Sequence, residues 1–193
     1  MTHLPLWFWI AVAVLLFWAV GAYNRLVRLR ADITQSFAGV EAHVRQREAS
    51  LSLWLDAAQG SSGAADEAKN VEHAAQSLRA ACAQVLVAVD VARRAPCAAQ
   101  AIASLRLAEE VLIGARGRLS TGLAVRSNSV SPAQNRAEWN SVLQTDELAA
   151  VDGSLSFARR RFNDAAQLYN EAATQFPTWV VAGVFGFRAA GLL

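Results

Sequence analysis

Hydrophobic residues near the N-terminus form one unbroken apolar run. Residues 4–24 contain no charged side chain. A helix of about 20 apolar residues spans the roughly 30 Å hydrocarbon core of a bilayer. Trp7 and Tyr23 lie toward the two ends of the run, where aromatic side chains favour the membrane interface. The pattern predicts a transmembrane anchor over residues 1–23.

A cleaved signal peptide is the alternative interpretation of this run. Ala19, Val20 and Gly21 loosely offer the small residues that a signal peptidase requires. However, no Lys or Arg precedes the run, and the run is longer than the apolar region of a signal peptide. We therefore expect an uncleaved anchor.

Beyond the anchor, apolar residues recur at spacings of three and four, which is typical of amphipathic α-helices. The spacing predicts four helices, over residues of about 24–56, 65–95, 96–119 and 132–176. Pro96 is placed as the first residue of the third helix, where its missing N–H is not needed. Gln59–Gly63 and Ser120–Asn135 have the composition of loops. The expected fold is all-α: an N-terminal transmembrane helix continuing into an antiparallel four-helix bundle over residues 24–177.

Two apolar stripes carry most of this prediction. The stripe of the first helix consists of Val27, Ile33, Phe37, Val40, Val44, Leu51 and Trp54. Arg30 and Arg47 fall on or near it, and they mark either its solvated ends or a buried ion pair. The last helix has a heptad seam, formed by Leu148, Val151, Leu155, Ala158, Phe162, Ala165, Tyr169, Ala172 and Phe176, and Pro177 ends it. Asn163 and Asn170 lie seven residues apart near the seam, so we predict that they fix its register by hydrogen bonding across the bundle rather than bind a ligand.

Composition and charge exclude several classes of protein. The hydrophobic fraction of 54% is too high for a disordered chain. The formal net charge of +2 is too small to indicate nucleic-acid binding. Cys82 and Cys97 belong to no metal or redox motif, so we expect small buried thiols, with a disulfide as the less favoured alternative.

Positive charge follows the apolar run. Arg25, Arg28 and Arg30 come directly after it. Because positive residues remain on the cytoplasmic side of a membrane, we expect the N-terminus outside and the bundle in the cytoplasm. The same arginines either contact anionic lipid as well or serve as topology signals alone.

Catalytic motifs are not evident in the sequence. His43 and His73 lack the nearby partners that a zinc site requires. Glu109-Glu110 and Asp146-Glu147 are adjacent pairs, and adjacent residues on a helix point about 100° apart, so neither pair can flank a bond. Arg159–Arg161 is interpreted as a solvated helix face, with an anion site as the less favoured alternative. We expect no enzymatic activity, no cofactor and no metal.

The last sixteen residues, 178–193, form an apolar tail whose single charged side chain is Arg188. Four antiparallel helices return the chain to the membrane side of the bundle. The tail therefore either packs into the base of the bundle or docks on the bilayer or a partner. The candidate interaction surface consists of Trp179, Val180, Val184, Phe185 and Phe187 in the tail, with Arg25, Arg28 and Arg30 beside the anchor.

The two ends of the chain resemble the LemA family of bacterial membrane proteins. The resemblance is carried by Tyr23–Arg30 after the apolar run, by Ala158–Asn170, and by Phe176-Pro177 followed by Val181–Phe187. It implies a short N-terminus, one span of the bacterial inner membrane and an antiparallel helical bundle. Some members of the family act at magnetosome membranes, and others are associated with membrane proteolysis or stress. The middle of the chain, Ala64–Asn135, shows little of the family's pattern.

Together these features favour a membrane-anchored scaffold or adaptor. Its expected partners are the lipid bilayer and either another membrane protein or a second copy of the chain. The alternative is a protein that shapes or organises membranes by self-assembly on the bilayer.

Overall fold

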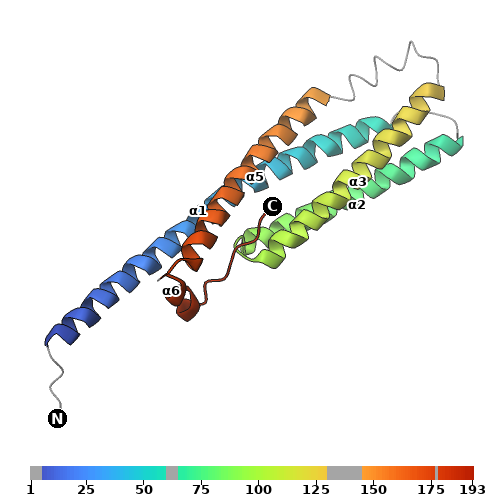
Figure 1. The fold of residues 1–193 in the computed structure, drawn as a ribbon. Helices are drawn as coiled ribbons and strands as arrows, with labels where there is room; N and C mark the ends of the chain where they lie inside the picture. The colour runs from blue at the N-terminus through green and yellow to red at the C-terminus, as the bar shows by residue number, and fades with distance from the viewer. Residues whose placement is uncertain (1–5, 60–64, 130–144, 177) are drawn as a thin grey trace.

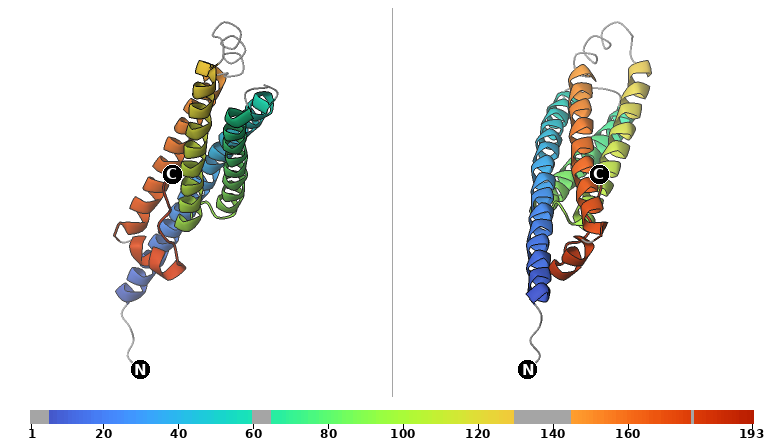
Figure 2. Two further views of the ribbon diagram at one scale, coloured as in Figure 1. Left: turned by 90° about the vertical axis from the view of Figure 1, so that its right-hand side faces the viewer. Right: turned by 60° about the vertical axis from the view of Figure 1, so that its left-hand side comes forward.

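The computed structural model describes residues 6–59, 65–129, 145–176 and 178–193, and this part of the chain is helical with no strand. Its helices are α1 (Leu6–Gln59), α2 (Ala65–Arg94), α3 (Ala99–Ser129), α5 (Thr145–Thr174) and α6 (Thr178–Phe185) (Figure 1). The four long helices form one bundle, with α1 beside α5 and α2 beside α3 (Figure 2). The expected all-α bundle is therefore confirmed.

Helix α1 is a single uninterrupted helix of 54 residues. At 1.5 Å per residue it is about 80 Å long. No proline occurs within it, so nothing in its sequence forces a kink. The predicted continuation of the apolar run into the bundle is confirmed.

The buried residues of α1 follow a heptad pattern. They include Leu26, Ile33, Phe37, Val40, Val44, Leu51 and Leu55. Val27, which we assigned to this stripe, is instead 42% exposed, because the heptad frame passes through Leu26, one residue earlier. The side chain of Trp54 lies outside the described residues.

Two element boundaries differ from the prediction. Pro96 lies in the turn between α2 and α3, where Ala98 donates a 2.9 Å hydrogen bond to the carbonyl of Ala95, and α3 begins only at Ala99. The predicted loop from Ser120 is also wrong as far as Ser129, since α3 continues to that residue. The hydroxyls of Ser120 and Thr121 each donate 2.9 Å bonds to the carbonyl of Gly117, so these polar residues are accommodated within the helix. The rest of that loop, and the predicted helical start over residues 132–144, lie outside the described residues.

The seam of α5 is buried almost as predicted. Phe162 is fully buried, and its ring meets that of Phe37 on α1 edge-on at 5.8 Å. Phe176 departs from the prediction because it is 82% exposed. Helix α5 ends at Thr174, so Phe176 no longer continues the helical seam.

The tail folds back on the bundle. Helix α6 packs against α1 and α5, and residues 186–193 then run back along α5 (Figure 1). Gly186 has φ of 71°, and the amide of Phe187 donates a 2.9 Å bond to the carbonyl of Ala182. This is the arrangement of a Schellman cap, in which glycine tolerates the left-handed conformation that ends the helix.

Two asparagines fasten the returning tail to α5. The side chain of Asn170 bonds both the N–H and the carbonyl of Ala190, at 2.7 and 3.0 Å, and Asn163 does the same with Leu193 at 2.9 and 2.8 Å. Seven helical residues rise about 10.5 Å and three extended residues span about 10 Å, so the two spacings match. Both asparagines make structural hydrogen bonds, but the predicted bonds across the bundle are wrong, because the partner is the backbone of the tail.

Candidate interaction surface

Helix α6 is apolar on both its buried and its exposed face. Thr178, Val181 and Ala182 are buried against the bundle. The opposite face is exposed, and together with the preceding Phe176 it forms what we call the α6 apolar face: Phe176, Trp179, Val180, Val184 and Phe185. Val184 is 76% exposed. One side of the tail therefore packs on the bundle, and the other side is left open.

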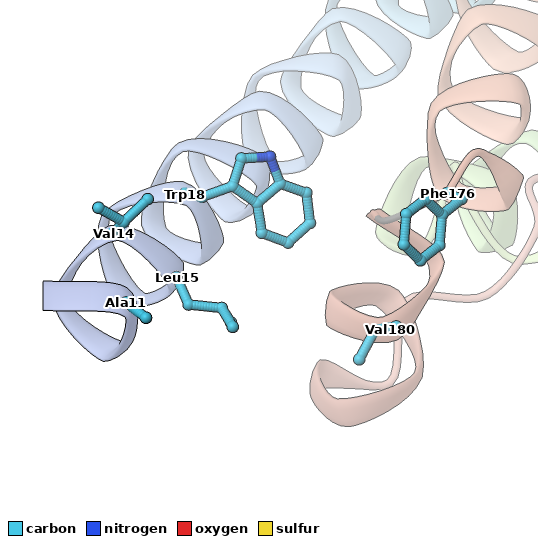
Figure 3. Close-up of a pocket in the computed structure, with 6 residues that line it drawn as sticks. All are labelled: Ala11, Val14, Leu15, Trp18, Phe176 and Val180. Carbon is cyan, nitrogen blue, oxygen red and sulfur yellow. The ribbon is translucent and has the colours of Figure 1, made fainter. Parts of the chain in front are cut away.

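The α6 apolar face lies beside the apolar run of α1. The ring of Tyr23 contacts Phe185 at 5.0 Å and Phe187 at 5.9 Å between centroids. An open groove of about 670 Å³ separates the two segments, and its lining residues are Ala11, Val14, Leu15, Trp18, Phe176 and Val180 (Figure 3). Because all six are hydrophobic, the groove offers almost no hydrogen-bonding group to water.

Two described helices are long and apolar enough to cross a membrane. They are Trp7–Leu53 within α1 and Lys69–Arg94 within α2. The two differ in burial, since 11% of the apolar window of α1 is buried against 33% of that of α2. Helix α2 contributes Leu78, Val85 and Val89 to the bundle core, whereas Val14, Leu15 and Phe17 of α1 have no such cover. These features are consistent with membrane association through α1.

The predicted basic residues lie where the apolar run ends. Arg25, Arg28 and Arg30 are exposed on α1, in the two turns that follow Tyr23. Among the described residues, none of the three forms an ion pair. Their charges are therefore available to lipid phosphates, to solvent or to a partner.

The structure brings most of the predicted surface residues together, with two changes. Phe187 is partly buried against the core and contacts Tyr23, so it supports the surface from beneath. Phe176 belongs to the surface although its spacing assigned it to the core. Pro177 could have indicated this exposure. The residue before a proline disfavours the helical conformation, so Phe176 cannot continue the buried seam of the helix.

A buried polar layer crosses the middle of the bundle. It consists of Arg47 and Glu48 on α1, Cys82 on α2, Glu109 on α3 and Arg159 on α5. Arg47 and Glu109 are 5% and 6% exposed, and their guanidinium and carboxylate are 3.5 Å apart. Arg159 also donates to Glu109. Arg47 therefore marks a buried ion pair, and the layer links the α1–α5 pair to the α2–α3 pair.

The arginine triplet of α5 is divided by this layer. Arg160 and Arg161 are exposed, as predicted for a solvated face. Arg159 is only partly exposed, because its guanidinium pairs with Glu109 on α3. The expectation of a wholly solvated triplet was wrong for this residue.

Burial raises the pKa of two groups in the layer. Burial and the neighbouring Glu48 raise the pKa of the Cys82 thiol to about 12, and burial also raises the pKa of Glu48. A thiol with so high a pKa stays protonated near neutral pH and is a poor nucleophile. Cys97 is likewise a free thiol whose pKa is raised by burial. Over the described ranges, no group of three or more His, Cys, Asp or Glu is placed to hold a metal ion.

The fold and the surface define an all-α bundle whose first helix begins with an exposed apolar segment. A comparison with protein-family models agrees, since the model of the LemA family matches residues 64–193, about two thirds of the chain. The chain belongs to the LemA family. The match includes the middle residues, where we predicted little of the family pattern, so that expectation was wrong. Neither a curated protein nor a solved structure matches the chain.

Proposed function

We propose that this chain is a membrane-anchored helical scaffold that presents the bundle to other membrane proteins or to a second copy of itself. Its role in this proposal is binding rather than catalysis. Helix α1 supports the proposal because it runs without a break from the apolar segment into the bundle core. A rigid connection of this kind holds the bundle at a fixed distance and orientation, which a flexible linker would not.

The observation that carries the proposal is the position of the α6 apolar face. It lies beside Leu15 and Trp18, at the level of the C-terminal half of the apolar run. If that run crosses the bilayer, Val180 and Phe176 lie at the depth of lipid. Each Å² of apolar surface removed from water contributes about 25 cal/mol, so lipid contact stabilises this arrangement. The membrane face of the scaffold is then α6 together with the apolar run of α1.

Orientation follows from the arginines. Arg25, Arg28 and Arg30 favour an N-terminus outside and a cytoplasmic bundle, in the inner membrane of a bacterium. A periplasm-active reporter fused after Leu193 should be inactive, and an active one would reverse the orientation.

The α2–α3 hairpin offers a candidate surface for protein partners. Val87 and Val91 on α2, and Leu107 and Val111 on α3, are exposed pairs four residues apart. Residues four apart lie on the same face of a helix. These pairs provide two short apolar stripes far in sequence from the anchor.

A membrane-shaping function is the second candidate. Helix α6 contacts the apolar run near its C-terminal end, where Tyr23 meets Phe185, and residues 7–10 at the other end do not line the groove. Insertion of such a helix adds volume to a single leaflet, which promotes curvature. A shaping protein should deform liposomes without a partner, whereas a scaffold should not.

Site-specific photocrosslinking of the full-length protein in its native membrane tests the scaffold proposal. A photoreactive residue at Leu107 is expected to yield a discrete adduct with a membrane protein or a second copy. The control position is Arg106 on the same helix, whose side chain is 60% exposed but polar and points about 100° away from Leu107 around the helix axis. Equal adducts from both positions, or protein adducts from neither, would contradict a scaffold that uses this face.

A further inference from the structure

A second cavity lies between α1, the α2–α3 turn and the start of the returning tail. It holds about 200 Å³. Its walls are Arg30 from α1, Cys97 with the neighbouring turn, Tyr169 from α5, and Gly186 and Arg188 from the tail. We call this cavity the arginine pocket. Its volume is below the roughly 300 Å³ at which pockets for drug-sized ligands begin, so it suits a small group.

The charge of the arginine pocket is positive and unbalanced. Arg30 and Arg188 line it, and no carboxylate does. In the described part of the chain, neither guanidinium lies within 4.0 Å of an acidic side chain. Arg45, Arg47 and Arg116, by contrast, each have an acidic partner. Two like charges that share one cavity repel each other, and a bound anion would remove that cost.

The fold itself creates this arrangement. The tail is fixed in place by Asn163 and Asn170, and the phenol of Tyr169 donates a 3.0 Å bond to the carbonyl of Arg188. Arg188 is thereby held at the mouth of a cavity that already contains Arg30, 158 positions earlier in the chain. Guanidinium groups bind phosphate oxygens through paired N–H donors, so two of them can hold one phosphate from two sides.

We propose that the arginine pocket binds a phosphate group, either the headgroup of an anionic lipid or free phosphate. The pocket lies close to the expected membrane surface, because Arg30 follows Tyr23 by seven residues, about 10 Å along the helix. The headgroup region extends roughly 5–8 Å beyond the hydrocarbon core on each side. The lipid source rests on the proposed membrane anchoring, whereas phosphate binding itself does not.

The alkylation rate of Cys97, which lines the pocket, reports on occupancy. The full-length Cys82→Ala protein in neutral detergent is labelled with and without phosphatidylglycerol, and separately with and without inorganic phosphate. Each variant is compared with itself, so changes in the intrinsic reactivity of the thiol cancel. We expect a protective ligand to slow labelling at least fivefold, and Arg30→Gln or Arg188→Gln to abolish the protection. Arg30→Lys should retain part of it.

Arg28→Gln is the matched control, since Arg28 has the same charge on the same helix but does not line the pocket. It should keep the full protection. Protection by lipid alone would assign the headgroup as the source, and protection by phosphate alone a soluble anion. Protection by neither ligand, or equal loss in Arg28→Gln, would overturn the proposal. Failure here leaves the scaffold proposal intact, because that one is measured at Leu107.

Discussion

Replacement of Glu109 by alanine should lower the free energy of unfolding by about 3–5 kcal/mol. The carboxylate of Glu109 accepts a hydrogen bond from the guanidinium of Arg159 and lies 3.5 Å from the guanidinium of Arg47. Without it, two arginines remain inside the bundle with Glu48 as the one nearby carboxylate of the polar layer. Removal of one partner from a buried ion pair costs about this much because the other charge stays buried and uncompensated. Chemical denaturation of the full-length protein in detergent measures the change.

The neighbouring Glu110 provides the control for that experiment. It is 64% exposed and makes one long contact, 4.0 Å, with Arg106. Glu110→Ala should therefore change the free energy of unfolding by less than about 0.5 kcal/mol. Equal effects of the two substitutions would mean that the polar layer does not link the helix pairs.

Phe162→Asp should abolish the folded bundle altogether. Phe162 is fully buried on the α5 seam and packs edge-on against Phe37. An unpaired buried carboxylate costs several kcal/mol, and the aromatic contact is lost as well, which together approach the whole stability of a small domain. Circular dichroism and thermal melting of the full-length protein report the result.

Phe157 is the matched control on the same helix. It is 64% exposed, so Phe157→Asp exchanges the same residue types without burying a charge. It should melt within a few degrees of the wild type. If Phe162→Asp melts as the wild type does, the seam is not part of the core.

Sequence periodicity predicted the bundle well because heptad spacing directly reflects helix packing. The buried positions of α5 and of most of α1 could be identified in this way. It failed at Val27, where residues 26 and 27 are both apolar and only the packing selects Leu26. It failed again from Ser120 to Ser129, where α3 continues and the hydroxyls of Ser120 and Thr121 bond to the helix backbone rather than interrupt it.

The surface was harder to predict than the core. Composition identified residues 178–193 as unusually apolar, but it could not divide them into a packed and an open side. That division depends on tertiary contacts, such as those of Val181 and Ala182 with the bundle. The sequence left a buried ion pair open for Arg47 but could not identify its partners. Glu109 and Arg159 are on two other helices, and no sequence spacing relates them to Arg47.

The two-sided tail also changes how its role can be tested. Truncation after Pro177 would remove the buried Val181 and Ala190 along with the exposed Val184. A loss of folding would then conceal any loss of membrane contact. Probes confined to the exposed side separate the two.

The depth of Val184 in a bilayer tests the central claim most directly. A spin label is placed there by Val184→Cys in the full-length Cys82→Ala, Cys97→Ala protein, in lipid nanodiscs. Its relaxation by oxygen and by a water-soluble nickel complex is compared with that of a label at the exposed Arg161 on α5. The scaffold account predicts that oxygen dominates at position 184 and that nickel dominates at position 161. Equal access of nickel to both labels would contradict the account, since α6 would then lie in water rather than in the membrane.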